Sequence, residues 1–558
     1  MWLAPAGFVD MAVVNYESLM YLDDNQGGIP MLKKYMWLCT VCLCLLAVMA
    51  GPNVWAHSFT QTELAYMPAM KQLELFKAGV IAPIDVLEAQ IARVEQYNGP
   101  IKKDTRDVLA DYKTWNGKVN AICFERFAEA RKAALESGKR WKNGTARALE
   151  GITVGIKNEN EVKGWRVDQG SLLLKDDAPC TFDGAITEKL KDAGAILAFS
   201  TTVPEFYLTF TTWSKLYGIT RNPWNGLYNV GGSSGGSGAA LAAGFCTLAT
   251  GSDMAGSIRV PASFNGLYGF KPPFGRVPTS SIQYETLGPM TRTFEDMVLM
   301  QNVISGPSQQ TISSMRPRLE YPMEYKDLKG AKIAVSHFSK WSGMGNDKDV
   351  TAAIDATVKA LRKAGATVDV IKFDWKGADA IHTFWDGLMS TSMYELVDMV
   401  EEKDLPLLTT YATEILKRKD GFGPRKIIAM EKLQDTYHAE VQRRIFAKGY
   451  TALIVPTVMT AEMPADMDID DTAKPVINGK RMEGDSMQGM LSHIFSLLNT
   501  YPVVNVPVAL SSNNVPIGVQ VVGNTFDDLE AFRVAAQLSK VMPKLYTGKL
   551  MPDFRNMK

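Results

Sequence analysis

Serine and glycine residues gather in one stretch, residues 230–261, which reads VGGSSGGSGAALAAGFCTLATGSDMAGSIRVP. Loops of this composition either hold phosphate on their backbone amides or expose a nucleophile. A phosphate-binding P-loop needs Gly-Lys-Ser/Thr after its glycines, and here alanines follow Gly238. A dinucleotide fingerprint needs a third glycine, and Leu241 stands in its place. The stretch therefore favours a nucleophile over a nucleotide.

Two serines of this stretch are candidates for the nucleophile, Ser233 and Ser257. Ser233 lies in Gly-Gly-Ser-Ser-Gly, which matches the G-x-S-x-G elbow of hydrolases that use a histidine base. No downstream histidine has neighbours typical of a triad base, although His493 stays open as a candidate; the four are His337, His382, His438 and His493. Ser257 lies among small residues directly after an apolar run. One helix and one strand are expected between the two serines, and this connection can bring them back together.

Lys157 is the candidate base for a reaction without histidine. It ends the apolar run GITVGIK, where a lysine is otherwise costly. A lysine accepts a proton only when it is neutral, and burial without a neighbouring carboxylate favours the neutral form. We therefore expect a buried Lys157 with no carboxylate beside it. Such a lysine would draw a proton from Ser233, which draws one from Ser257, and the relay would then run backwards to a leaving nitrogen.

The elements that must position these residues follow from the spacing of apolar residues. Three-to-four spacing predicts helices over residues 62–79, 82–99 and 120–139. Beyond residue 150, short apolar runs predict buried strands that alternate with helices. The strands are expected within 151–159, 194–201, 245–253, 331–338, 366–371, 449–458, 501–510 and 516–523, and the helices within 184–193, 235–244, 350–363 and 526–542. This alternation predicts an α/β fold with a sheet covered by helices on both faces.

Longer runs of the sequence resemble the amidase signature family, the Ser–cis-Ser–Lys amidases. The resemblance rests on GGSSGGSGAALAAG and ATGSDMAGSIRVPASFNGLYGFKPPFGRVP, on GITVGIKNEN and ITRNPWNG upstream, and on TALIVPTV and TYPVVNVPVALSSNNVPIGVQVVGNTFDD downstream. It covers most of the chain from about residue 61, whereas residues 315–450 are only loosely similar. It implies a single large domain built on a mixed central sheet.

The resemblance also implies a role for each matching residue. Ser257 matches the nucleophile, Ser233 the serine that follows a cis peptide, and Lys157 the base. Four consecutive backbone N–H groups match the oxyanion hole, those of Met254, Ala255, Gly256 and Ser257. Many members have glycine where Ala255 stands, and alanine narrows the allowed backbone angles. A similar Asp-x-Ala-Gly-Ser run occurs in the aminohexanoate cyclic-dimer hydrolases.

Asp253 and Arg259 flank the proposed nucleophile at positions that suit an ion pair. We expect them to form a buried network that supports the loop, and we expect no direct part in the chemistry.

The N-terminal residues have the pattern of a secretory signal. Two lysines at 33–34 precede an apolar run over 36–51, and Val54 and Ala56 offer small residues for cleavage. The run is shorter than the about 20 residues that span a bilayer, which favours cleavage over the alternative of a membrane anchor. We expect a periplasmic or secreted protein without stable membrane insertion. The expected parts are an upstream extension with a signal peptide (1–56, the signal at 31–56) and an amidase domain (57–558), divided into a helical part (57–140), a core (141–314 and 450–558) and a helical excursion (315–449).

Composition narrows the function class further. Lys and Arg together number 60, as do Asp and Glu, so no basic surface for nucleic acid is indicated. The histidines and cysteines lack the spacing of metal ligands, and we expect no metal and no cofactor. We expect an amidase that cleaves a linear or cyclic small-molecule amide through a serine acyl-enzyme.

Two alternatives to a hydrolytic amidase are considered. A transamidating subunit that works on charged tRNA would need cytosolic partner chains, which the signal pattern disfavours. A non-catalytic amidase-like binding protein is disfavoured by the presence of Lys157, Ser233 and Ser257.

Overall fold

The computed structural model describes residues 59–101, 117–279, 283–338, 341, 343–375, 377–467, 475–482 and 486–557. The expected extension and signal peptide, residues 1–56, lie outside the described residues. Residues 60–558 form one compact unit. Within the described ranges, none of the helices has both the length and the apolar character needed to cross a bilayer.

A mixed sheet of 11 strands runs through this unit. In order across the sheet, the strands are β1 (Ile122–Glu125), β3 (Ile196–Thr201), β2 (Thr153–Lys157), β6 (Leu248–Asp253), β8 (Thr286–Thr291), β7 (Tyr268–Lys271), β14 (Val503–Leu510), β15 (Pro516–Val522), β11 (Ala452–Pro456), β9 (Lys332–Val335) and β10 (Thr367–Val370). The pairs β3–β2, β2–β6, β11–β9 and β9–β10 are parallel, and the other neighbours are antiparallel. Two short hairpins lie outside this sheet: β4 (Trp213–Ser214) with β5 (Gly218–Ile219), and β12 (Val476–Ile477) with β13 (Lys480–Arg481).

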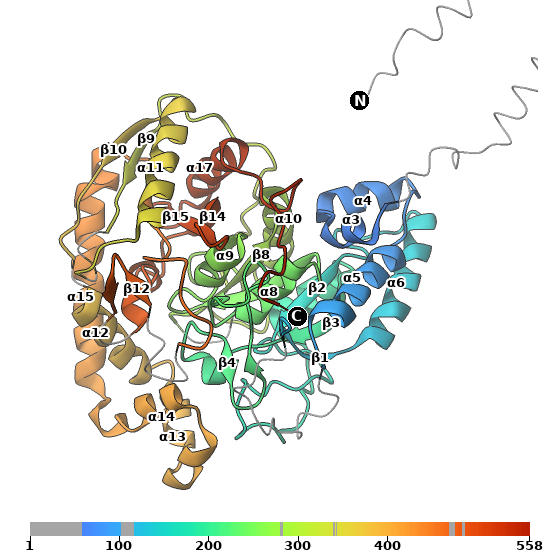
Figure 1. The fold of residues 1–558 in the computed structure, drawn as a ribbon, viewed down its shortest axis with the longest axis horizontal. Helices are drawn as coiled ribbons and strands as arrows, with labels where there is room; N and C mark the ends of the chain where they lie inside the picture. Colours follow the sequence, from blue (N-terminus) through green and yellow to red (C-terminus); the bar gives the residue numbers. More distant parts are fainter. Residues whose placement is uncertain are drawn as a thin grey trace, which may run out of the picture. The chain divides into compact units, whose positions relative to one another are not determined.

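Helices cover both faces of the sheet (Figure 1). The α-helices are α3 (Gln61–Tyr66), α4 (Ala69–Lys77), α5 (Pro83–Tyr97), α6 (Phe127–Lys142), α7 (Ala185–Asp192), α8 (Gly235–Ala243), α9 (Arg259–Asn265), α10 (Phe294–Ile304), α11 (Lys348–Lys363), α12 (Gly377–Met389), α13 (Tyr394–Met399), α14 (Thr410–Leu416), α15 (Pro424–Arg444), α16 (His493–Leu497) and α17 (Asp528–Val541). Short 3-10 helices are η2 (Glu205–Tyr207), η3 (Glu402–Leu407), η4 (Lys419–Gly421), η5 (Phe446–Lys448) and η7 (Ser486–Gly489). Helices α8 and α9 contact each other and the central strands, while α11 and α17 contact each other and strands β14, β15 and β11. The predicted α/β class with a mixed, doubly covered sheet is confirmed.

Two of the predicted helices differ from the structure. The helix expected over 62–79 is two helices, α3 and α4, because Pro68 cannot continue α3 and instead precedes the first turn of α4. The helix expected over 120–139 begins only at Phe127, and residues before it form β1. β1 pairs antiparallel with β3, so tertiary pairing outweighs the helical pattern of its residues.

The register of the central strands places two chemically important chain segments at the same edge. β2 and β6 are parallel neighbours, with Val154 opposite Leu248 and Gly155 opposite Ala249. Their carboxyl ends therefore meet, which brings Lys157 at the end of β2 next to the loop that follows Asp253. Ligands of open α/β sheets commonly bind at such an edge. Helix α8, buried on all sides, begins two residues after Ser233 and packs on both strands.

Candidate active site

Lys157 is fully buried, and its side-chain nitrogen contacts two hydroxyls. Its Nζ lies 2.8 Å from Ser233 Oγ and 2.7 Å from Ser252 Oγ. Its backbone N–H donates to Thr250 Oγ1 at 2.9 Å. Thr250 and Ser252 are two residues apart in β6, so their side chains lie on the same face of the sheet. The structure thus brings together Lys157 and Ser233, which are 76 residues apart in the chain.

A carboxylate also contacts this lysine, and the expectation of a site without one is wrong. Glu159 Oε2 lies 2.7 Å from Lys157 Nζ. Burial raises the pKa of the Glu159 carboxyl, but the charge of Lys157 and hydrogen bonds with Glu285, Lys157 and Ser252 outweigh it and hold the pKa below its usual value. Residue patterns alone did not identify Glu159, Glu285 or Ser252, although Glu159 stands only two residues beyond Lys157.

The three contacts of Lys157 suit a neutral amine as well as an ammonium. A neutral amine has two N–H donors and one lone pair. In that state it can donate to Ser252, while its lone pair accepts the hydroxyl proton of Ser233 and the Glu159 carboxylate lies beside it at 2.7 Å. The remaining partners therefore orient the lone pair toward Ser233.

Ser233 lies on a tightly packed segment of backbone ahead of α8. The peptide bond between Gly232 and Ser233 is cis. A Cβ at residue 232 would lie 2.8 Å from the carbonyl carbon and oxygen of Phe210, closer than van der Waals contact allows. Glycine is therefore required at 232 for the backbone to approach Phe210.

Ser257 follows β6 on a loop whose backbone N–H groups are without acceptors. The N–H groups of Met254, Ala255, Gly256 and Ser257 donate no hydrogen bond within the described part of the chain. Gly256 has φ of +132°, which favours glycine, and a Cβ there would clash with Ser492 Oγ. Ala255 is not among the residues with positive φ, so its side chain costs the loop no backbone strain. The Ser492 hydroxyl donates to Ala255 O at 2.7 Å and holds the loop from the side of α16.

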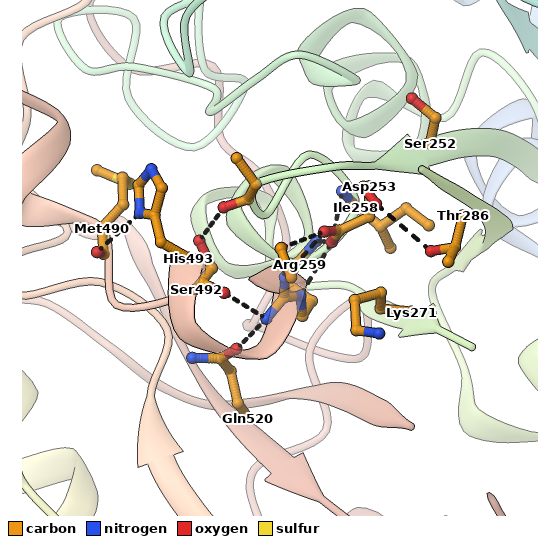
Figure 2. A network of polar contacts seen from close by, with 12 residues as sticks. Ser252, Asp253, Ile258, Arg259, Lys271, Thr286, Met490, Ser492, His493 and Gln520 are labelled. Carbon is orange, nitrogen blue, oxygen red and sulfur yellow. Dashed lines mark hydrogen bonds and ion pairs between the residues drawn. The ribbon is translucent and has the colours of Figure 1, made fainter. Parts of the chain in front are cut away.

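Asp253 and Arg259 form a buried ion pair at the base of this loop (Figure 2). The Arg259 guanidinium donates to both Asp253 carboxylate oxygens, at 2.8 and 2.9 Å. It also donates to Ser492 O at 3.0 Å, and Gln520 and Ser496 accept from it as well. Burial raises the pKa of the Asp253 carboxyl, but the charge and hydrogen bonds of Arg259 outweigh burial, so the net pKa lies below its usual value. Neither residue lines the two cavities that meet at Ser257, which matches a supporting position.

These two cavities are of unequal size. The wide cavity has a volume of about 340 Å³, and Ser233 and Ser252 line it together with Ser257. The narrow cavity has a volume of about 20 Å³. Four residues line both cavities: Tyr207, Ala255, Ser257 and Trp385. Helices α12 and α13 close the wide cavity through Trp385, Glu395, Leu396 and Met399.

None of the four histidines that the structure describes is placed as a triad base. No histidine of the described chain hydrogen-bonds to Ser233 or Ser257. His493 lines the narrow cavity and contacts Met490 O through Nδ1 at 3.3 Å, and burial lowers its pKa to about 4. His438 contacts the Tyr501 hydroxyl, and His337 lies near Asp355. The elbow with a histidine base therefore has no geometric support.

The described ranges likewise contain no cluster of side chains that would support catalysis by a metal ion or by a cysteine. No group of three or more His, Cys, Asp or Glu side chains there is arranged to hold a metal ion. The cysteines of the described chain, Cys123, Cys180 and Cys246, are free thiols.

Comparisons with known proteins agree with one another. The sequence model of the amidase family matches residues 104–531. A glutamyl-tRNA(Gln) amidotransferase subunit of Desulforapulum autotrophicum is 30% identical over 493 residues, which cover 81% of this chain and 97% of that protein. The corresponding subunit of Maridesulfovibrio salexigens is 32% identical, over 73% of this chain and 86% of that protein.

Solved structures share the fold at lower identity. A bacterial aryl acylamidase has a TM-score of 0.73 at 23% identity and covers 85% of this chain and 96% of its own. A 6-aminohexanoate cyclic dimer hydrolase has a TM-score of 0.71 at 24% identity and covers 88% of this chain and 99% of its own.

Proposed function

We propose, on the premise that this chain belongs to the amidase family, that it hydrolyses a carbon–nitrogen amide bond through an acyl-enzyme on Ser257. The observation that carries the proposal is the contact of Lys157 Nζ with Ser233 Oγ at 2.8 Å, in a cavity that Ser257 also lines. A buried lysine, a hydroxyl relay and four unbonded N–H groups beside a second hydroxyl are the parts that amide hydrolysis needs.

The proton relay begins with neutral Lys157. Its lone pair takes the proton of Ser233, and Ser233 takes the proton of Ser257 as Ser257 Oγ attacks the amide carbon. No hydrogen bond joins the two serine hydroxyls in the described chain, and such contacts commonly tighten only when substrate is bound. Glu159 and Ser252 hold the other two sides of the amine, so that the lone pair faces Ser233.

The tetrahedral intermediate places a negative oxygen near the loop after β6. The N–H groups of Met254 to Ser257 are the donors available to it. One such donor contributes about 3 kcal/mol to a transition state in comparable sites. The relay then reverses, Ser233 protonates the leaving nitrogen, and water hydrolyses the acyl-enzyme on Ser257.

A second candidate is a component of an amidotransferase. The relatives with 30 and 32% identity are named as such components, which is the observation in its favour. An amidotransferase moves the nitrogen of a primary amide to an acceptor. Activity of the purified chain alone on amides other than primary ones would favour the hydrolase, and activity only with added partner chains and tRNA would favour the amidotransferase.

Export remains a proposal that rests on the sequence of residues 31–56 alone. N-terminal sequencing of the protein from its native host should begin at His57. A mature protein that retains residues 36–51 in the membrane fraction would instead support the anchor.

The nucleophile and base can be tested by labelling and kinetics on the purified protein. A fluorophosphonate probe should label Ser257, and Ser257→Ala should abolish both labelling and hydrolysis of an amide panel without changing the melting temperature. Lys157→Ala should lower kcat by several orders of magnitude, whereas His493→Ala should retain most of it. Labelling of Ser233, or an inactive His493 variant beside an active Lys157 variant, would overturn the relay.

A further inference from the structure

A further cavity adjoins the wide one and shares three carboxylates with it. This second cavity has a volume of about 310 Å³, and Glu159, Glu161 and Glu285 line it as well as the wide cavity. The exposed side chains of Phe182 and Ile312 also line it, so it opens to solvent. A group attached to an amide in the wide cavity can therefore extend past the three glutamates into the second cavity.

Glu161 is the carboxylate of this set that no cation of the protein balances. Glu159 contacts Lys157, and Glu285 forms a hydrogen bond with Glu159, whereas Glu161 forms no ion pair within the described ranges. The described linings of both cavities contain no lysine, arginine or histidine. Burial, and to a smaller extent the charge of Glu159, raises the pKa of the Glu161 carboxyl. A partly buried carboxylate without a counter-ion is costly, and a cation from outside the chain would offset that cost.

Two neutral side chains of the second cavity also lack hydrogen-bond partners. Asn160 and Thr279 line the cavity and are only 5% and 4% exposed. Asn160 Oδ1 and Thr279 Oγ1 accept no hydrogen bond from the part of the chain that the structure describes. Buried oxygens without a partner are uncommon in proteins. The second cavity thus combines carboxylates with unused acceptors, and an ammonium, which has three donors and no acceptor, complements both.

We infer that the substrate carries an organic ammonium group, which extends from the amide at Ser257 to Glu161 in the second cavity. The inference rests on the proposed function and assigns its substrate class. An organic cation is favoured over a metal ion, because no group of three or more ligating side chains in the described ranges is arranged to hold a metal. The walls next to the carboxylates are apolar at Ile186 and Leu287, which suits the alkyl chain that bears an ammonium.

The first test compares amides that differ only in one terminal group, assayed with the purified chain. The terminal group is an ammonium, a hydroxyl or a carboxylate, on spacers of increasing length attached to the acyl or to the amine side. At the best spacer length, kcat/KM for the ammonium should exceed that for the hydroxyl by about 10-fold or more, the effect of one charged hydrogen bond. The carboxylate should be the poorest of the three, and the preference should shrink at high salt.

Substitution of Glu161 tests which residue sets this preference. Glu161→Gln should remove most of the ammonium-to-hydroxyl ratio and leave kcat/KM for the hydroxyl compound unchanged. As a control, Glu188→Gln should keep the wild-type ratio, because Glu188 is an exposed carboxylate of α7 that lines neither cavity.

A second variant acts on the same carboxylate without removing its charge. A Cβ at residue 184 would lie 2.4 Å from Glu161 Oε2, and the backbone there, with φ of −67°, accommodates alanine. Gly184→Ala should therefore displace the Glu161 carboxylate and lower the ratio even if the glutamine variant does not fold.

Binding of cadaverine, a linear diamine, reports on the cation site without turnover. Calorimetry should detect binding to Ser257→Ala, and adding Glu161→Gln to that variant should weaken it about 10-fold. Hydrolysis without an ammonium preference, or a preference that neither Glu161→Gln nor Gly184→Ala moves, would overturn the inference and leave an amidase. Cadaverine binding that depends on Glu161, without hydrolysis of any amide and without fluorophosphonate labelling of Ser257, would instead support the cation site and overturn the proposed function.

Discussion

Replacing Glu159 with glutamine should move the rise of kcat/KM with pH toward lower pH. In the proposed relay Lys157 acts only when neutral, so activity appears as pH increases through the loss of one proton. The Glu159 carboxylate, 2.7 Å from Lys157 Nζ, favours the protonated amine. Glutamine keeps an oxygen in the same place as acceptor and removes only the charge, so the neutral amine becomes available at lower pH.

The size of this shift follows from the burial of the pair. The Lys157 side chain is 0% exposed and that of Glu159 14%, so solvent screens their interaction little. Removing an opposite charge at contact distance in such a setting displaces the midpoint of a pH–activity profile by about 1–3 pH units. Each unit corresponds to about 1.4 kcal/mol of interaction free energy. At a pH well below the wild-type midpoint, the glutamine variant should therefore be at least about tenfold faster than the wild type, provided that the intrinsic rate of the neutral state is retained.

The assay is kcat/KM between pH 5 and 10 for the wild type, Glu159→Gln and Glu395→Gln. Glu395 is an exposed carboxylate of the same cavity and has no contact with Lys157, so its variant should keep the wild-type midpoint. A midpoint in Glu159→Gln that is unchanged or higher would refute the reasoning, because removal of an adjacent anion cannot favour an ammonium. The same result would indicate that Lys157 is not the base.

Two further predictions concern stability and are read from urea denaturation. Asp253→Asn should lower the free energy of unfolding by about 3–5 kcal/mol, because Arg259 would be left as a buried charge without its counter-ion. As a control, Glu88→Gln breaks an exposed pair with Arg131 and should lower it by less than about 1 kcal/mol. Equal losses in the two variants would contradict the argument. In the folded protein the pKa of His493 is about 4, below the ordinary 6.5. The stability that comes with its neutral imidazole is therefore fully present above pH 6.5 and is lost as pH falls toward 4. Over that pH window the free energy of unfolding of the wild type should fall by about 3 kcal/mol more than that of His493→Gln. A variant of the exposed His382 should follow the wild type.

Resemblance of the serine- and glycine-rich runs predicted the family, and local patterns predicted the fold class and the elements that carry the site. The run that ends at Lys157 and the run that ends at Asp253 were both predicted as strands, and the structure has β2 and β6 there. The chain between β2 and β6 includes β3 as well as α8, so the side-by-side placement of β2 and β6 is set by pairing in the sheet, whereas α8 itself was indicated by its alanines and glycines. The roles assigned to Ser233, Ser257 and Lys157 stay predictions that the proposed experiments test.

Contacts made across the sheet could not be predicted from local patterns. Glu285 precedes β8 and reaches the same cavity as Glu159 only because β8 pairs with β6, a pairing between segments with no pattern in common. The residues of β1 are too few for their pattern to distinguish a strand from the start of a helix, and the pairing with β3 determines that they form a strand. The break before α4 was visible as Pro68, whose effect on the preceding turn outweighs the helical spacing around it.

The contacts of Arg259 connect the nucleophile loop to segments that follow it by more than two hundred residues. Its guanidinium holds Asp253 beside that loop and reaches Ser492 and Ser496 near and in α16 and Gln520 in β15. A nascent chain that has emerged only as far as Ser257 therefore lacks the anchors that shape its own oxyanion-binding backbone. Those anchors arrive more than two hundred residues later, so a chain that stops before Ser492 leaves Arg259 with Asp253 alone among these partners. We therefore expect activity only from chains that extend at least through β15.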